Sequence, residues 1–322
     1  MVNKIKQSSR ETTTPMFSFR NFFTSKNKSQ RNDAPEELHN NPGRRVSILD
    51  SLIQHFVPVN FRDIFNLTPT DSLQEKHFVV TVITQVLRVA TSLNLGFRSQ
   101  NGFVYYYNGQ YWEQISEADV KSFLGRASLR MGVSEENSKF FRFKDTLFKQ
   151  FVSDTEFTEP RVITDTVLIN LKNGTFEITP PGAFLRDFRP DDFLKYQLGF
   201  SYNEKATSPM FEEYLLKVLP DENLQLVLAE FIGYVFTKHL KLEKCLMLYG
   251  DGANGKSVFY EIINALLGKE NVSNYSLSDL NEENCRALIS NKLLNYGSEI
   301  HGRIEADRFK SLVSRENIQA RL

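Results

Sequence analysis

The stretch G-D-G-A-N-G-K-S at residues 250–257 decides the fold, because it matches the phosphate-binding pattern G-x-x-x-x-G-K-[ST] at every fixed position. An unbroken apolar run, C-L-M-L-Y at residues 245–249, precedes it and is typical of a parallel strand covered on both faces. Downstream, apolar residues recur at helical spacing from Val258 to Leu266, and Gly268 follows where a helix C-cap glycine is expected. The order of strand, glycine loop and helix predicts an α/β fold built around a P-loop.

The chemistry of phosphate binding explains this pattern. A triphosphate carries closely spaced charged oxygens, and Gly250, Gly252 and Gly255 permit the tight bend that turns backbone N–H groups toward them. Lys256 can then reach the β- and γ-phosphates, while the Ser257 hydroxyl can hold Mg²⁺. We predict that ATP is bound by the whole loop, namely Gly250, Asp251, Gly252, Ala253, Asn254, Gly255, Lys256 and Ser257. The alternative is a glycine-rich turn that binds nothing.

The composition is that of an ordinary soluble protein, with 41% hydrophobic and 24% charged residues. The 322 residues are enough for about two domains. Because 39 basic residues balance 39 acidic ones, the net charge gives no indication of a nucleic-acid partner. Two cysteines, Cys245 and Cys285, favour a reducing cytoplasm over a disulfide framework. No apolar run approaches the roughly 18 residues of a membrane span, so no membrane partner is expected.

Three regions follow from the pattern along the chain. Residues 1–45 carry nine basic and four acidic residues and are expected to form a disordered basic arm. Residues 46–205 are expected to form a mixed α+β domain. In it an amphipathic helix from about Leu73 to Leu93 follows a capping box at residues 71–74, and a further helix covers about residues 134–152. Residues 206–322 are expected to form the ATPase core, which begins with two helices near residues 208–220 and 222–236.

Two hairpins are predicted inside the middle region. Asn108-Gly109 stands between two aromatic runs, and Lys172-Asn173-Gly174-Thr175 stands between two apolar ones. The aromatic residues of the first hairpin have two interpretations, since they could stack unpaired bases or pair across the hairpin and pack on the next helix. They are Tyr105, Tyr106, Tyr107, Tyr111 and Trp112.

Residues from about 100 to 322 resemble the helicase half of phage and plasmid primases, which are related to the poxvirus primase-helicase. The resemblance rests on four segments: residues 170–178, the helical pair around Phe211 and Gly233-Tyr234, the P-loop, and the chain from Lys292 onward. It implies a superfamily-three helicase core with an AAA-like parallel sheet, preceded by the accessory domain. It also implies an origin in a phage or plasmid and a place in the bacterial host cytoplasm.

The second catalytic position is Glu299, at the end of the short predicted strand K-L-L-N-Y-G-S-E, residues 292–299. A P-loop ATPase needs an acid beside the phosphate loop to support Mg²⁺ and a base to orient the attacking water. Ser298 stands where many P-loop proteins have Asp, and the Ser-Glu pair agrees with the resemblance. We predict that Glu299 activates water and supports Mg²⁺ beside Ser257. The alternative is an ordinary surface glutamate at a strand end.

Residues 307–321 resemble the segment that leads into a DNA-contacting hairpin in these helicases. Ser314-Arg315-Glu316 stands where the family commonly has Gly-Gly-Asp, so the turn departs from the family pattern. Lys310, Arg315 and Arg321 are candidate phosphate contacts for DNA. A solvated basic helix face is the alternative.

The chain ends at Leu322, before the sensor asparagine and the arginine finger that the resemblance implies. An arginine finger contributes about 10³–10⁵ in rate, so residues 1–322 by themselves are expected to be a truncated core that binds nucleotide and turns it over slowly.

The first functional hypothesis is an ATP-dependent DNA helicase of phage or plasmid replication. The resemblance implies a homo-hexamer that acts on a single strand or a fork, with ATP between subunits and a separate primase as a further partner. The second hypothesis is a nucleotide-binding assembly module that does not unwind DNA. A third, a small-molecule kinase, needs an acceptor site that the sequence does not show.

Overall fold

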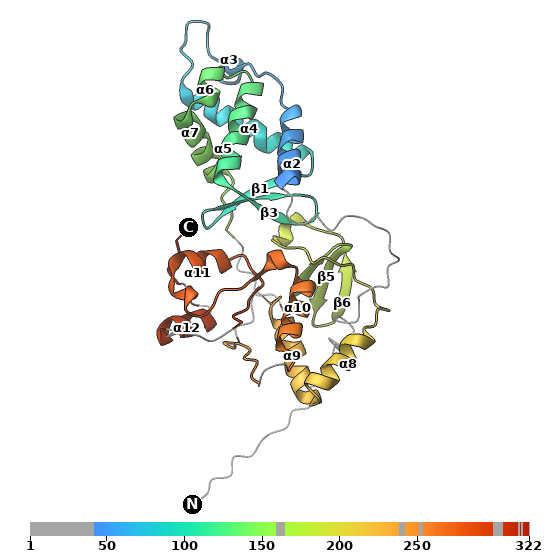
Figure 1. The fold of residues 1–322 in the computed structure, drawn as a ribbon. Coiled ribbons are helices and arrows are strands. Elements are labelled where there is room, and N and C mark those ends of the chain that lie inside the picture. The colour runs from blue at the N-terminus through green and yellow to red at the C-terminus, as the bar shows by residue number, and fades with distance from the viewer. Residues whose placement is uncertain are drawn as a thin grey trace, which may run out of the picture. The chain divides into compact units, whose positions relative to one another are not determined.

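The computed structural model describes residues 42–158, 165–237, 242–250, 254–298, 305–314, 316 and 318–321 (Figure 1). Almost all of the predicted basic arm lies outside these residues. Residues 203–234 belong to one compact unit, and the other described residues belong to a second unit. Among the described residues, none of the helices is both long and apolar enough to cross a membrane.

The N-terminal part of the second unit is mainly helical (Figure 1). Its helices are α2 (Pro42–Gln54), α3 (Phe61–Ile64), α4 (Glu75–Ser92), α5 (Glu117–Arg130), α6 (Glu135–Lys139) and α7 (Phe141–Asp154). Helices α4, α5 and α7 bring their apolar faces together, because residues three and four apart lie on one side of a helix. Val82, Leu124 and Leu147 are fully buried in the resulting core.

Helix α4 confirms the predicted helix, but its N-terminal cap differs from the prediction. Gln74 is the N-cap residue, and its backbone N–H donates to His77 Nδ1 at 3.2 Å. Asp71 instead closes the preceding turn, where its carboxylate accepts hydrogen bonds from the backbone N–H and the hydroxyl of Thr68 at 2.7 and 2.8 Å. Asp and Thr side chains commonly form such local hydrogen bonds, which compete with helix formation.

The helical stretch predicted at about residues 134–152 is confirmed, except that Phe140 divides it into α6 and α7. Ser134 caps α6, and the backbone of Phe140 is extended, with ψ at 128°. Phe143 and Phe151 are buried in the core, whereas Phe140 and Phe141 are 48% and 60% exposed. The apolar pattern was read as one continuous face, and the break rotates two phenylalanines out of it.

A three-stranded antiparallel sheet packs against these helices. It consists of β1 (Gly96–Gln100), β2 (Phe103–Tyr107) and β3 (Trp112–Ile115), and the β2–β3 hairpin confirms the Asn108-Gly109 turn. Side chains alternate along β2, so Val104 and Tyr106 join the helical core, while Tyr105 and Tyr107 pack with Trp112 and Phe193 on the other face. Packing on the helices is therefore confirmed for Tyr106, whereas Tyr105, Tyr107 and Trp112 are buried in a separate cluster with Phe193.

A second antiparallel meander follows, made of β4 (Val167–Leu171), β5 (Gly174–Thr179) and β6 (Gly182–Arg186). It confirms the turn at residues 172–175. The chain then passes through the short 3-10 helix η1 (Pro190–Asp192) to Phe193, whose φ of 46° is unusual for a large residue. The Trp112 N–H donates to the Leu194 carbonyl at 2.8 Å, and the indole N–H donates to Pro190, also at 2.8 Å. These bonds attach the segment after η1 to the first sheet.

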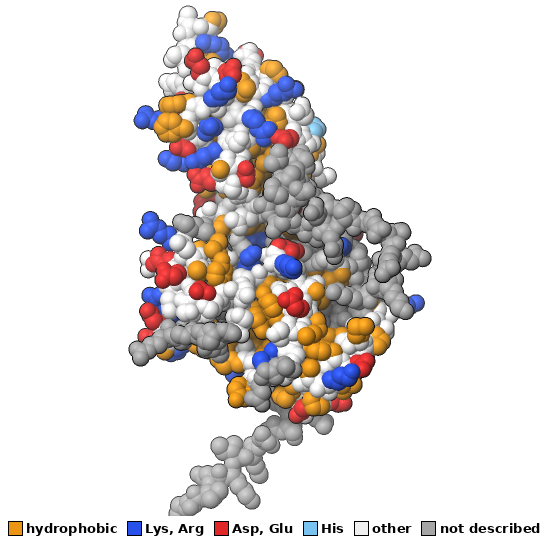
Figure 2. Space-filling view, in the orientation of Figure 1, with side chains coloured by type: hydrophobic (Ala, Val, Ile, Leu, Met, Phe, Trp, Pro, Cys, Tyr) orange, Lys and Arg blue, Asp and Glu red, His pale blue; other side chains and the backbone are white. Residues whose placement is uncertain are grey.

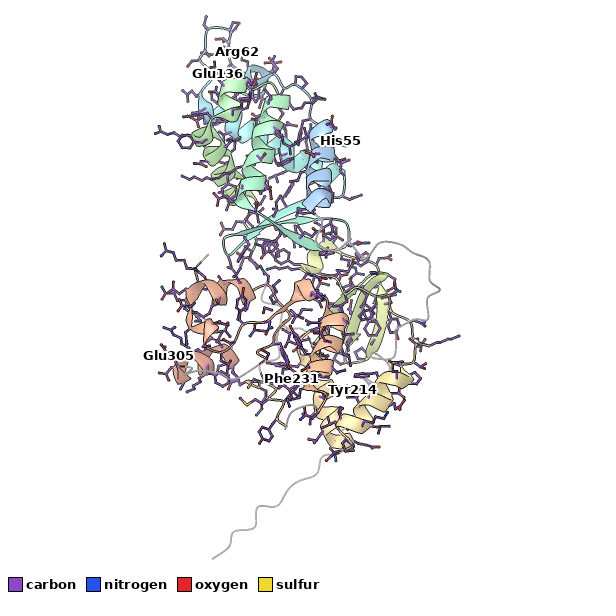
Figure 3. All side chains as sticks on the ribbon, in the orientation of Figure 1. His55, Arg62, Glu136, Tyr214, Phe231 and Glu305 are labelled. Atoms are coloured by element: carbon purple, nitrogen blue, oxygen red, sulfur yellow. The ribbon has the colours of Figure 1, made fainter. Side chains whose placement is uncertain are left out.

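The compact unit at residues 203–234 contains two helices, α8 (Pro209–Val218) and α9 (Glu222–Tyr234), as the sequence predicts. Figure 3 labels Tyr214 on α8 and Phe231 on α9. Several apolar side chains of both helices are exposed, among them Met210, Leu216 and Val227.

The C-terminal part of the second unit holds the predicted ATPase elements. They are α10 (Lys256–Leu267), η2 (Lys269–Asn271), β7 (Val272–Ser273), η3 (Asp279–Asn281), α11 (Glu283–Ile289), β8 (Leu294–Asn295) and α12 (Ala306–Val313). Strands β7 and β8 pair in parallel. Gly268 ends α10 with φ at 87°, which confirms the predicted C-cap glycine.

Candidate nucleotide-binding site

Helix α10 begins inside the predicted phosphate loop. Gly255 is its N-cap residue, with φ at 90°, a left-handed conformation that an L side chain rarely adopts. The Gly255 carbonyl accepts the first helical hydrogen bond from Phe259 N–H at 3.0 Å. The backbone conformation therefore explains why the motif has glycine at position 255. The loop leads directly into the N-terminus of α10, where an anion is favoured.

The Lys256 side chain folds back over this loop. Its ammonium group donates to the Gly250 carbonyl at 2.8 Å and to Asn254 Oδ1 at 2.7 Å. Through these two contacts Lys256 connects Gly250, the first residue of the motif, to Asn254. The cation is thus held at the mouth of the loop, beside the N-terminus of α10, where the phosphates of a nucleotide would meet it.

Ser257 is exposed in the first turn of α10. Its hydroxyl is open to a hydrated Mg²⁺ held mainly by phosphate oxygens, which is how this cation usually binds beside a nucleotide. Among the described residues, no group of three or more His, Cys, Asp or Glu side chains could hold a metal ion by itself. The donor set therefore fits a cation that arrives with the nucleotide, where it would neutralise phosphate charge. Asp251, Gly252 and Ala253 lie outside the described residues.

The predicted strand before the loop takes a different form. Residues 242–250 contain no assigned strand, and Met247 and Tyr249 are 62% and 98% exposed. No strand in the described part of the chain pairs with this run, and Leu246 is its one partly buried apolar side chain. The parallel P-loop sheet remains a prediction, and the described parallel ladder is the short pair β7 and β8.

Strand β8 leads toward the second predicted catalytic position. The Leu293 N–H donates to the Asn271 carbonyl and the Tyr296 N–H donates to the Ser273 carbonyl, both at 2.8 Å. These two bonds extend the pairing of the strands beyond β7 and β8 themselves. Asn295 secures the end of the strand, because its Oδ1 accepts from the Ser273 hydroxyl at 2.9 Å and from Tyr275 N–H at 3.0 Å. Ser298 is exposed just beyond, and Glu299 lies outside the described residues.

A pair of tyrosines joins α10 to this strand. The rings of Tyr260 and Tyr296 stack with centroids 4.0 Å apart and planes 22° apart. Burial raises the pKa of the Tyr296 phenol above its ordinary value, and the neighbouring Tyr260 raises it further. The Tyr296 phenol therefore stays neutral near pH 7. One ring stands four residues after Lys256 and the other three residues before Glu299, so the stack brings the two motif segments together.

Sequence reasoning missed this pair. The available signal was an aromatic residue on each of the two segments assigned to one site, but it does not show that the rings meet. Asn254 was predicted only as part of the binding loop, and its contact with Lys256 is a further role that the motif does not indicate.

The predicted DNA contacts are only partly described. Lys310 is exposed on α12, and Arg321 is exposed, with its backbone N–H 3.4 Å from the Glu283 carbonyl. Arg315 lies outside the described residues. The buried Arg286 of α11 has a structural role instead, since it donates to the carbonyls of Leu280, Asn281 and Gln319 at 2.7–3.0 Å.

Comparison with known proteins locates two matches on the chain. Residues 90–220 match the family described as D5 N terminal like, and residues 248–322 match a family of unknown function, DUF5906. A stretch of 121 residues is 28% identical to the putative helicase 121R of Invertebrate iridescent virus 3. The matched stretch covers 36% of this chain and 13% of that viral protein. The chain is therefore similar to the D5 N terminal like family over residues 90–220 and to part of a viral protein named as a putative helicase.

Proposed function

We propose that this protein is an ATP-dependent DNA helicase of the primase-helicase type. ATP would be hydrolysed at the P-loop, and the energy would be used to move DNA during replication. The observation that carries the proposal is the position of the Lys256 ammonium group, 2.8 Å from the Gly250 carbonyl at the N-terminus of α10. This is the geometry of a cation set to receive phosphate oxygens.

The tyrosine stack and the parallel strand pair support the same proposal. Hydrolysis needs a base close to the γ-phosphate, and we propose Glu299, which follows the stacked Tyr296 by three residues in the sequence, for this role. In the proposed mechanism Lys256 binds the β- and γ-phosphates, Ser257 supports Mg²⁺, and Glu299 accepts a proton from the attacking water. The similarity to a D5 N-terminal domain and to a viral putative helicase favours DNA over a small molecule as the second substrate.

Lys310, Arg315 and Arg321 are proposed to contact DNA phosphates, and the working form is proposed to be a ring of identical subunits, with six as the expected number. A P-loop core with an AAA-like parallel sheet, preceded by an accessory domain, is the fold that this proposal requires. A role in phage or plasmid DNA replication and a separate primase partner belong to the same proposal.

The proposal predicts that ATP hydrolysis by the full-length protein rises with single-stranded DNA and is lost in Lys256→Ala. Lys269→Ala is the matched control, because Lys269 is an exposed lysine at the other end of α10. Steady-state phosphate release measures both variants. Phosphate transfer to a small molecule without any response to DNA would indicate a kinase instead, and equal hydrolysis by Lys256→Ala and the native protein would remove the site assignment.

A further inference from the structure

An exposed pair of phenylalanines stands at the junction of α6 and α7. Phe140 and Phe141 are 48% and 60% exposed, and their rings contact each other edge to face, with centroids 5.2 Å apart. The next phenylalanine, Phe143, is buried in the helical core. The fold therefore buries one of three neighbouring rings and leaves about half of each of the other two in contact with water, where the exposed area gains no stability.

The backbone under these rings is firmly held. Phe140 N–H donates to the carbonyls of Glu136 and Asn137, both at 3.0 Å, and the Phe140 carbonyl accepts from Lys144 N–H at 3.1 Å. Glu136, labelled in Figure 3, lies on α6 directly before the junction. A rigid aromatic pair keeps its rings in place with little loss of conformational entropy on binding, which suits a stacking surface.

Cationic residues lie before and after the pair along the chain. Arg142 is exposed, with its guanidinium carbon 5.8 Å from the Phe141 ring centroid, and Lys149 is exposed two turns further along α7. Lys139 precedes the pair and forms a surface ion pair with Glu135, which contributes little to stability and can be exchanged for another anion. Figure 2 shows Lys and Arg side chains interspersed with hydrophobic ones over the helices of this part of the chain.

These charges do not serve the helix that carries them. Arg142 lies in the first turn of α7, where a cation opposes the helix dipole, and this first turn contains no acidic residue. The nearby acid Asp145 is already paired with Lys121 of α5, and the hydrogen bond from that lysine lowers the pKa of the Asp145 carboxyl. The sequence from Lys139 to Lys149 therefore carries more cations than anions, and Asp145 is its one acidic residue.

We propose that Phe140 and Phe141, with Arg142 and Lys149, form a binding site for single-stranded nucleic acid. The rings stack on unpaired bases, and the cations contact the phosphates on either side. Aromatic rings interleaved with cations are the combination that holds single strands without regard to sequence. The proposal relies on the proposed function for the choice of DNA as the test ligand, and it adds a contact surface outside the residues predicted from the sequence.

Fluorescence anisotropy with a labelled 20-nucleotide oligo(dT) tests this site on the full chain. The double variant Phe140→Ala/Phe141→Ala should weaken binding at least about tenfold, since base stacking on one ring typically changes affinity by that amount. The tyrosine double variant at the same positions keeps the rings and should bind like the native protein. Phe184→Ala is the matched control, because Phe184 is 50% exposed on β6.

Two further readings complete the test. Arg142→Ala should make the salt dependence of binding shallower by about 0.7 in log–log slope. Photocrosslinking with 5-iodouracil in the oligonucleotide should label the peptide that contains Phe140 and Phe141. Lys256→Ala should keep this binding, so failure of the nucleotide site and failure of this site can be told apart.

Binding by the alanine double variant within twofold of the native protein overturns the proposal. So does a change from oligomer to monomer by light scattering with unchanged DNA affinity, because the surface would then be a protein contact. Circular dichroism melting of each variant confirms that loss of binding does not come from loss of folding.

Discussion

At the scale of single residues, Gly174 shows how one backbone position limits the sequence. Its φ is 144°, and a Cβ atom placed there would lie 2.4 Å from the Arg186 carbonyl oxygen of β6. That oxygen belongs to the backbone of the paired strand, so it cannot move aside without breaking the sheet. The turn at residues 172–175 therefore needs glycine for a steric reason beyond turn propensity.

We expect Gly174→Ala to destabilise the protein by about 1–3 kcal/mol, the usual cost of a strained backbone position. Gly182→Ala is the control in the same sheet, since nothing lies within 4 Å of its added Cβ and its φ is not positive. Urea unfolding followed by circular dichroism measures both. Equal stability of the two variants would contradict the steric explanation.

At the scale of secondary-structure elements, the Tyr260–Tyr296 stack is the described side-chain contact that links the phosphate-loop helix to the strand before Glu299. Aromatic pairs contribute about 0.5–1.5 kcal/mol beyond the burial of their area. Because the two rings touch, their effects on stability should not be additive.

A double-mutant cycle with Tyr260→Ala and Tyr296→Ala should therefore give a coupling free energy of about 0.5–1.5 kcal/mol in urea unfolding. In the same cycle with Tyr260→Ala and Phe184→Ala, the two changes in unfolding free energy should add, because Phe184 lies on a different element, β6, whereas Tyr260 stacks on Tyr296. A coupling of zero for the tyrosine pair would show that the stack does not join the two elements.

The same elements show which parts of the fold are readable from sequence. Local signals were sufficient for the Asn108-Gly109 hairpin and for Gly268 at the end of α10, because each depends on neighbours within a few residues. The break at Phe140 was missed, since an apolar pattern does not show where its phase changes.

Contacts between distant segments were beyond sequence reasoning. The left-handed Phe193 is held by Trp112, 5.3 Å away between ring centroids, and by Phe157 at 4.7 Å. No local pattern indicates that a large aromatic residue should take this conformation. In the candidate site, the motif predicted the loop and Lys256, whereas the contact of Lys256 with Asn254 and the tyrosine stack depend on tertiary packing.

At the scale of the whole molecule, three features support the proposed role in nucleic-acid replication: the contact of Lys256 with Gly250, the similarity of residues 90–220 to the D5 N terminal like family, and the aromatic and basic surface at the junction of α6 and α7. The most important of these proposals is that the loop with Lys256 over Gly250 binds ATP. The other proposals depend on it, since a motor without nucleotide moves nothing.

Isothermal titration of the protein with a slowly hydrolysed ATP analogue and Mg²⁺ tests that claim most directly. We predict one binding event, weakened at least about tenfold in Lys256→Ala, since charged hydrogen bonds typically contribute 1.5–3 kcal/mol, and preserved in Lys269→Ala. Native affinity in Lys256→Ala, or no heat of binding in the native protein, would contradict the account.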